Sequence, residues 1–237
     1  MKYNSGINKK EREQIFSLFL HNSRLKFNEI EKAIKIRSNM VSYHLEKMRE
    51  QEILEKNQEY YQLTKDSEKY IPIFANITGE KLSPVPIILV AIMHKNKILM
   101  IKRNRRPYKD YWSMIGGKML LNEDFKQSSI RIVKEKTGLD AEFISFNSIM
   151  QEKVKTNNEV KHNFILFFTK TGVDKEKFSN SEHGELKWFN IEDLNPKNTI
   201  PSDYWLLKNK FSANIEVLNA EMNDDNGKLS NFKIQQT

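Results

Sequence analysis

A glycine pair, an arginine and two glutamates lie close together in the middle of the chain. Gly117 is followed after five residues by Glu123, and after seven more by Arg131, with Glu135 and Lys136 close behind. Carboxylates are the ligands that a divalent cation prefers, and such a cation can polarise a phosphoryl group and activate water. These residues are therefore candidates for holding a divalent cation, provided that enough of the carboxylates are present.

The pattern resembles the Nudix box, G-x5-E-x7-R-E-U-x-E-E-x-G-U, where U is an aliphatic residue. The stretch Arg131–Leu139 carries the second half of the box, and Arg103–Trp112 and Gly116–Lys118 are similar to the strand and loop that precede it. The resemblance spans about residues 85–210. It implies an α+β fold, a Nudix-type α/β/α sandwich with a mixed sheet. It also implies three helix glutamates that bind divalent metals, which bridge a diphosphate and activate water.

Two of the three glutamate positions are changed in this chain. They correspond to Ile132, Glu135 and Lys136, which at i, i+3 and i+4 share one helix face. Isoleucine offers no ligand, and Lys136 brings a cation to the place of the metal's charge. We therefore expect no standard Nudix hydrolysis. Glu123, Arg131 and Glu135 remain the catalytic candidates, Glu123 and Glu135 the metal-binding ones, and Mg²⁺ is expected as a cofactor only if hydrolysis is retained.

Other interpretations of these residues stay open. Carboxylates from later strands and loops could replace the missing metal ligands, and the candidates are Glu152, Glu159 and Glu185. Glu123 and Glu135 can equally belong to a solvated helix face, and Arg131 to an ordinary surface ion pair.

Cations and aromatic side chains near the glycine pair favour binding of a nucleotide or another phosphorylated small molecule without cleavage. Lys136 would act as a tethered substitute for the metal, and Trp112 or Tyr111 would stack on a base. The expected ligand-binding residues are Arg103, Arg105, Lys109, Trp112, Gly116, Gly117, Lys118 and Lys136. The alternatives are a solvated strand edge or a second DNA contact for the basic run, a core position for Trp112, and turn geometry for the glycines.

The first third of the chain has a helical pattern. Apolar residues at helical spacing predict helices over 9–21 and 27–34 and a third from about residue 39, with Val41, Leu45 and Met48 as its buried stripe. Two short strands are predicted around the polar turn 56–59. This order of elements is that of a winged helix-turn-helix.

Residues 38–48, 52–56 and 60–64 resemble the ArsR-like winged-helix regulators. The resemblance implies binding of double-stranded DNA through polar groups on the third helix and the wing, which can contact base edges and phosphates. The residues in question are Arg37, Asn39, Ser42, Tyr43, Lys47 and Lys56. A winged helix that binds protein, or a helical domain with a merely solvated polar face, remains an alternative.

The change of pattern along the chain predicts four segments. These are a winged-helix domain over 1–76, a linker over 77–86, a Nudix-like domain over 87–212 and a β-hairpin extension over 213–237. In the Nudix-like domain the expected strands are 87–93, 98–102, 143–151, 162–169 and 186–189, and the expected helices are 123–136, ended by Gly138, and 203–211.

Composition limits the class of protein. The chain has 237 residues, a net charge of +8 and no cysteine, which excludes disulfide scaffolds, thiolate zinc sites and cysteine nucleophiles. No apolar run is long enough to cross a bilayer, so we expect a soluble, cytoplasmic protein without a membrane partner. The excess positive charge favours a polyanionic partner.

The parts together predict a transcriptional regulator that binds DNA and whose degenerate Nudix domain senses a nucleotide-type or phosphorylated ligand. The arrangement is similar to Nudix-related bacterial regulators of NAD metabolism, with the domain order reversed. A homodimer is expected, with the terminal hairpin as a contact surface or as an ordinary edge of the Nudix sheet. The alternative is an active Nudix hydrolase of nucleoside diphosphate-linked substrates that uses the winged helix for targeting or dimerisation.

Overall fold

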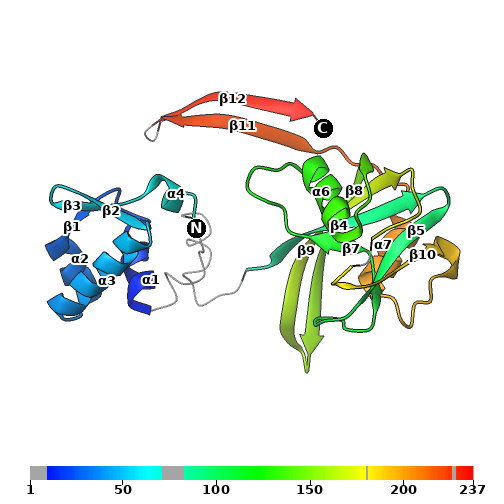
Figure 1. Cartoon of the computed structure of the whole chain (residues 1–237), viewed down its shortest axis with the longest axis horizontal. Coiled ribbons are helices and arrows are strands. Elements are labelled where there is room, and N and C mark those ends of the chain that lie inside the picture. Colours follow the sequence, from blue (N-terminus) through cyan, green and yellow to red (C-terminus); the bar gives the residue numbers. More distant parts are fainter. Residues whose placement is uncertain (1–9, 71–82, 180, 226–227, 237) are drawn as a thin grey trace. The chain divides into compact units, whose positions relative to one another are not determined.

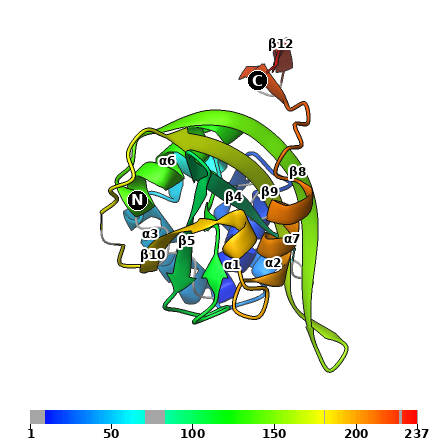
Figure 2. The same cartoon turned by 90° about the vertical axis from the view of Figure 1, so that its right-hand side faces the viewer.

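The computed structural model of the chain describes residues 10–70, 83–179, 181–225 and 228–236 (Figures 1 and 2). The chain divides into two compact units between Ser83 and Pro84. Each unit has its own core, so each is described by itself. The helices in the described ranges are too short and too polar to span a lipid bilayer.

The N-terminal unit packs three helices against a small antiparallel sheet. Its elements are α1 (Lys10–Leu18), β1 (Leu25–Lys26), α2 (Phe27–Ile34), α3 (Ser38–Glu50), β2 (Leu54–Asn57), β3 (Tyr60–Leu63) and the short α4 (Lys65–Glu68). The strand order is β1-β3-β2. Val41, Leu45 and Met48 form the buried face of α3 and contact Phe16 of α1 and Ile30 of α2 in one core, so the predicted stripe of the third helix is confirmed.

The C-terminal unit is built on a seven-stranded mixed sheet. Its elements are β4 (Val85–His94), β5 (Lys97–Arg103), β6 (Trp112–Ser113), β7 (Ile115–Gly117), α6 (Phe125–Thr137), β8 (Ala141–Thr156), β9 (Glu159–Val173), β10 (Gly184–Asn190), the 3-10 helix η2 (Ile191–Asp193), α7 (Pro201–Asn209), β11 (Leu218–Asp225) and β12 (Lys228–Gln236). The main order is β10-β5-β4-β9-β8, with β6 on β5 and β7 on β4. β4 and β9 are parallel, and the other pairs are antiparallel.

Alternate side chains of β4 divide this unit into two cores. Ile88, Val90 and Ile92 pack on the side of α6, while Leu89 and Ala91 pack on the side of α7. This follows from the period of two along a strand, which sends successive side chains to opposite faces of the sheet. The sheet is therefore covered by a helix on each face, the α/β/α arrangement that the sequence predicts.

The two ends of α6 are fixed by local chemistry. The Asp124 carboxylate accepts a hydrogen bond from the backbone N–H of Gln127 at 2.7 Å, which caps the first turn. Gly138 has a φ of 74° and donates its backbone N–H to the Lys134 carbonyl at 2.9 Å. The left-handed C-cap predicted at Gly138 is thereby confirmed.

Several boundaries differ from the prediction. Strand β4 begins at Val85, inside the expected linker 77–86. Residues 71–82, which include the end of the expected winged-helix domain and the first part of the linker, lie outside the described ranges. Strands β8 and β9 run well beyond the expected ends, because their pairing continues past the buried positions. Strands β6 and β7 were not predicted, since each has only two or three residues. The terminal hairpin, β11 with β12, forms a sheet of its own and is not an edge of the large sheet.

Candidate functional site

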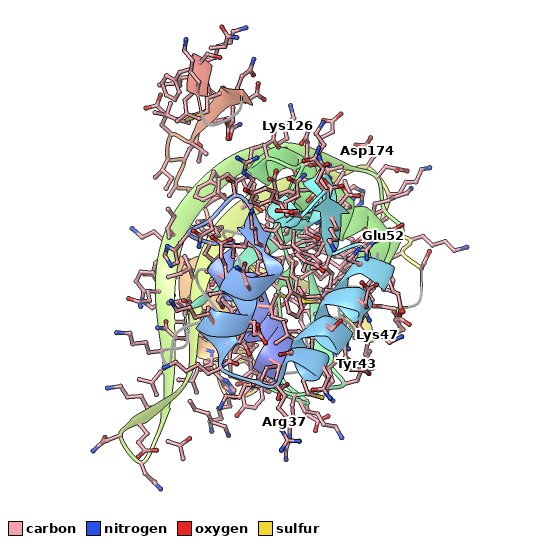
Figure 3. The ribbon with its side chains drawn as sticks, turned by 90° about the vertical axis from the view of Figure 1, so that its left-hand side faces the viewer. Arg37, Tyr43, Lys47, Glu52, Lys126 and Asp174 are labelled. Atoms are coloured by element: carbon pink, nitrogen blue, oxygen red, sulfur yellow. The ribbon has the colours of Figure 1, made fainter. Side chains whose placement is uncertain are left out.

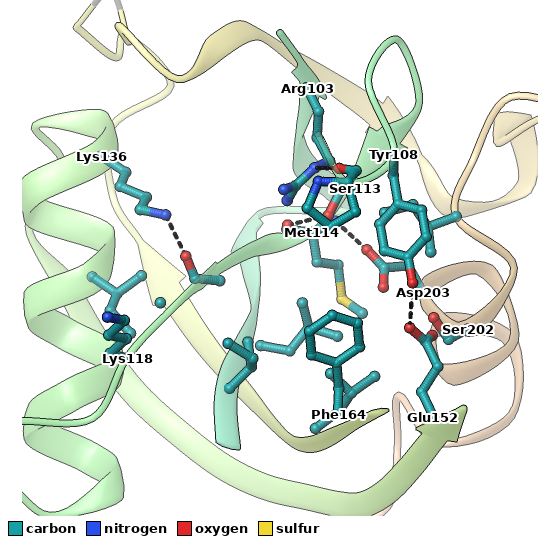
Figure 4. A pocket seen from close by; sticks show the side chains of 18 of the residues that line it. Arg103, Tyr108, Ser113, Met114, Lys118, Lys136, Glu152, Phe164, Ser202 and Asp203 are labelled. Atoms are coloured by element: carbon teal, nitrogen blue, oxygen red, sulfur yellow. Dashed lines mark hydrogen bonds between the residues drawn. The ribbon is translucent and has the colours of Figure 1, made fainter. Parts of the chain in front are cut away.

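A cavity of about 420 Å³ opens between α6, the end of β5, β7 and the start of α7. One end is cationic, with Arg103, Arg105, Lys118 and Lys136 on its wall. The middle is apolar and the other end carries carboxyl and hydroxyl groups. Figure 4 shows Lys136 and Lys118 on one side of this pocket, with Glu152, Ser202 and Asp203 on the opposite side.

Lys136 is half-buried and extends from α6 to the backbone of β7. Its ammonium donates a hydrogen bond to the carbonyl oxygen of Gly116 (Figure 4). Burial lowers the pKa of Lys136, and the nearby Arg105 and Arg103 guanidiniums lower it further. None of the ion pairs among the described residues includes these three cations. The cationic end is therefore a concentration of positive charge that the Glu135 carboxylate, which also lines the pocket, offsets only in part.

Ile132 lies one turn before Lys136 and is buried with 1% of its surface exposed. It packs against Ile88, Val90 and Ile115 in the core under the sheet. A Cβ atom on Gly117 would stand 2.8 Å from Ile132 Cγ1, so this glycine is needed for close packing as well as for the strand. Ile132 thus fills the place of a ligand with hydrocarbon.

Arg131 holds both remaining acidic candidates. Its guanidinium pairs with Glu123 and donates to Glu135 Oε2 at 2.9 Å and to the Lys118 carbonyl at 2.8 Å. Glu123 also accepts hydrogen bonds from the Leu120 N–H at 3.0 Å and from the Ser128 hydroxyl at 2.7 Å. The Arg131 hydrogen bond lowers the pKa of Glu123 to about 2. These contacts fasten the loop before α6 to the helix.

The residues do not fit the metal site that the Nudix box implies. One ligand position is the buried Ile132, another is the ammonium of Lys136, and the carboxylates of Glu123 and Glu135 are engaged by Arg131. In the described ranges, no group of three or more acidic or histidine residues is placed to hold an ion. Magnesium needs several oxygen ligands at close range, and this helix face does not provide them.

The other end of the pocket contains a buried acid. Asp203, at the start of α7, accepts the backbone N–H of Met114 at 2.7 Å. Tyr108 donates its hydroxyl to Glu152 Oε1 at 2.8 Å on the same wall. Burial raises the pKa of Asp203 to about 7, and the Glu152 carboxylate adds to the rise. Asp203 therefore holds a proton over part of the neutral pH range.

The structure brings most of the expected ligand-binding residues together but not all. The pocket wall includes Arg103, Arg105, Gly116, Gly117, Lys118 and Lys136, together with Arg131 and Glu135. Trp112 lies elsewhere, because its ring packs edge-on against Phe189 at 4.8 Å in the core on the α7 side. Lys109 is exposed, and neither it nor Tyr111 lines the pocket.

The three carboxylates proposed to replace the missing metal ligands also lie partly inside and partly outside the pocket. Of the three replacement carboxylates, only Glu152 lines the pocket, and Glu159 and Glu185 do not. Tyr108 and Asp203 also line the pocket and were not predicted from the sequence. An acid within the apolar segment 200–207 was the available signal for Asp203, whereas Tyr108 carried no signal beyond its place in the loop.

The expected DNA-contacting residues lie on the N-terminal unit. Arg37, the N-cap of α3, is exposed, as are Asn39, Ser42 and Tyr43 on the first half of the helix, and Figure 3 shows Arg37, Tyr43 and Lys47 following one another from the N-cap along α3. Lys47 pairs with Glu50 at 2.5 Å. On the β2–β3 hairpin, the exposed Lys56 lies 5.3 Å from the centre of the Tyr61 ring.

Comparison with known proteins finds a family match in the C-terminal unit. The NUDIX domain model matches residues 83–209. The uncharacterized Nudix hydrolase YvcI of Bacillus subtilis (strain 168) is 26% identical over 113 residues, which are 47% of this chain and 70% of YvcI. Among solved structures, the mutator MutT protein from Bacillus halodurans has 17% identity and a TM-score of 0.47, covering 63% of this chain and 96% of its own. The MutT protein from Methanosarcina mazei Go1 has 22% identity and a TM-score of 0.45, covering 54% and 91%.

Restoring the two changed positions should restore metal binding. We expect the double variant Ile132→Glu/Lys136→Glu to bind Mg²⁺ at least about tenfold more tightly than the unchanged chain, a difference of about 1.4 kcal/mol. The new carboxylates would join Glu135 as oxygen ligands on the same helix face. Isothermal titration calorimetry measures this, with Ile132→Gln/Lys136→Gln as the uncharged control. Equal Mg²⁺ affinity in all three proteins would show that these positions are not the ligand positions.

The raised pKa of Asp203 should make stability depend on pH. The folded protein holds this proton up to about pH 7, whereas in the unfolded chain the carboxyl loses it near its ordinary pKa of 3.8. Stability from this group is therefore lost as pH rises, on the order of 2 kcal/mol between pH 5 and 8. Urea unfolding should show this loss relative to Asp203→Asn, which keeps the shape and cannot titrate. Parallel pH profiles for the two proteins would contradict it.

Proposed function

The chain belongs to the NUDIX domain family, whose model matches more than half of its length, and we propose that its Nudix domain binds a nucleotide-type or phosphorylated ligand without hydrolysing it. The observation that carries the proposal is the ammonium of Lys136, held against the Gly116 carbonyl at the cationic end of the pocket. A cation fixed there attracts a phosphate as a metal ion would. It offers hydrogen-bond donors but no site at which a water molecule becomes a nucleophile.

The surroundings of Lys136 support an anionic ligand. Arg103 and Arg105 lie on the same wall, and their positive charges repel the ammonium of Lys136. An anion placed among the three would relieve this repulsion. Arg103 is oriented by a hydrogen bond from its Nε to the Pro107 carbonyl at 2.9 Å. The apolar middle of the pocket, with Phe164 and Leu166, suits the ring of a nucleotide beside that phosphate.

A Nudix hydrolase is the second candidate function. The family match and the relative YvcI, which is named as an uncharacterized Nudix hydrolase, favour it more directly than they favour a regulator. Glu135 and Glu152 both line the pocket and would be the carboxylates at its disposal. The two candidates differ in one respect, because a hydrolase consumes its ligand only with a divalent cation, and a sensor leaves it intact.

A ligand screen separates the two functions. We expect at least one compound from a panel of ADP, ADP-ribose and UDP-sugars to raise the melting temperature equally with Mg²⁺ and with EDTA, and to be recovered unchanged. Lys136→Met should weaken that binding about tenfold, since a charge-assisted hydrogen bond is worth roughly 1.5–3 kcal/mol. The matched control is Lys134→Met, which removes an exposed lysine from the same helix and should leave affinity unchanged. Mg²⁺-dependent turnover that Glu135→Gln abolishes would establish the hydrolase instead.

For the N-terminal unit we propose a winged helix that binds double-stranded DNA and makes the chain a ligand-responsive transcriptional regulator. The order of α1, α2, α3 and the β2–β3 hairpin supports this, as does the exposure of Arg37, Asn39, Ser42 and Tyr43 on α3. The net charge of residues 1–76 is only +3, from 14 basic and 11 acidic residues, so a few well-placed contacts must supply the affinity.

DNA binding should depend on the first half of α3. Arg37→Ala should weaken binding and reduce the salt dependence by about one phosphate contact. Tyr43→Ala should weaken it as well. The control is Lys69→Ala on the last turn of the unit, where the lysine pairs with Asp66 at 2.7 Å. Fluorescence anisotropy with genomic fragments at several salt concentrations measures the effect. A chain that binds no fragment at low salt, or an Arg37→Ala protein as active as the control, would remove the DNA-binding function.

A further inference from the structure

The terminal hairpin, β11 with β12, is amphipathic although it forms a separate two-stranded sheet (orange to red in Figure 1). Along β11, Leu218, Ala220 and Met222 alternate with polar residues and so point to one side. Ile234 pairs directly with Ala220, which places Ile234, and Phe232 two residues before it, on the same side. One side of the ribbon is therefore an apolar face.

An irregularity in the pairing extends this side toward the turn, where it carries Leu229 opposite Asp224. The register shifts between Glu221 and Asn223, and Asn231 on the opposite strand has a φ of 54°. This extra residue lets Leu229 pair with Asp224 and share the side of Phe232, although the two are an odd number of residues apart. The polar side holds the cross-strand pairs Glu221 with Lys233 and Asn223 with Ser230.

The apolar face is exposed. Its five large side chains, Leu218, Met222, Leu229, Phe232 and Ile234, have between 51% and 64% of their surfaces accessible. A two-stranded hairpin is at best marginally stable in water unless its apolar face packs against another layer. We therefore expect the apolar face to be covered by a surface outside the hairpin.

We propose that this face packs against the same face of a second copy of the chain, so that the hairpin is a dimerisation element. Two such ribbons present the same apolar side, and these sides would stack as facing sheets about 10 Å apart. Covering five half-exposed side chains on each copy removes about 1,000 Å² in total, the lower limit of a specific interface. A two-fold pairing needs one self-complementary surface per copy, and the hairpin supplies it.

The rest of the described surface offers no strand pair with an exposed apolar row of this length. Ile144 and Ile149 on β8 are exposed but stand five residues apart, and Val160 on β9 lies beyond them. The base of the hairpin is tied to the Nudix unit, because Ile215 donates its backbone N–H to the Phe146 carbonyl at 2.9 Å. The apolar face could therefore pack against the Nudix unit of the same chain, and the experiment has to distinguish this packing from packing against a second copy.

Light scattering on the full chain tests the proposal. We expect a mass of twice 28.1 kDa for the unchanged protein, and a mass of 28.1 kDa for Phe232→Lys, whose ammonium would be buried in the interface. Ser230→Lys places the same charge on the polar side and should remain dimeric. A monomeric unchanged protein, or a Phe232→Lys protein that stays dimeric, overturns the proposal. A monomer whose Nudix unit loses thermal stability on Phe232→Lys would assign the face to that unit instead.

Cross-linking provides a second readout that does not require loss of the dimer. Because the chain has no cysteine, a single one can be introduced at Ala220 on the apolar face or at Ser230 on the polar face. A bismaleimide about 10 Å long, the distance between facing sheets, should link two Ala220→Cys chains and leave Ser230→Cys chains single. Equal linking of both variants, or of neither, overturns the face-to-face arrangement. The outcome is independent of ligand binding in the Nudix pocket.

Discussion

The chemistry of the Nudix unit depends on one contact, the ammonium of Lys136 against the carbonyl oxygen of Gly116. It joins α6 to β7 at the wall of the pocket, where a half-buried cation lies near Arg103 and Arg105 and Glu135 offsets part of their repulsion. A metal ion would bring a larger charge and bound water to this position. An ammonium brings a single charge and three donors. In the proposed function, the same sheet and helix present a phosphate-binding surface and leave the bound phosphate uncleaved.

The residues around Lys136 are consistent with an ammonium in the place of a metal ion. Ile132 is part of the hydrocarbon core, and Gly117 leaves room for it. Arg131 binds Glu123, Glu135 and the Lys118 carbonyl, and so closes the loop over the start of α6. In this arrangement the surviving carboxylates have structural partners. The loop and helix of the Nudix box keep their shape because arginine and isoleucine stabilise them.

The sequence predicted the parts of the fold that have local causes. The spacing from Gly117 to Leu139 located α6 and its cap, and the spacing of Val41, Leu45 and Met48 located the buried side of α3. It could not show which side chains meet across the sheet. Asp203 contacts Met114, and Tyr108 contacts Glu152, across separations that no local pattern records. For Trp112 the sequence left open stacking on a base or a position in the core, and its contact with Phe189 shows the core position.

In the proposed function, the pocket binds a phosphorylated ligand by its own cations. The most direct measurement is the affinity of the chain for ADP-ribose in EDTA and again in Mg²⁺, with the compound analysed after each titration. We expect the same dissociation constant in both solutions and full recovery of intact ADP-ribose. Binding that appears only with Mg²⁺, or cleavage of the compound once Mg²⁺ is added, would contradict it.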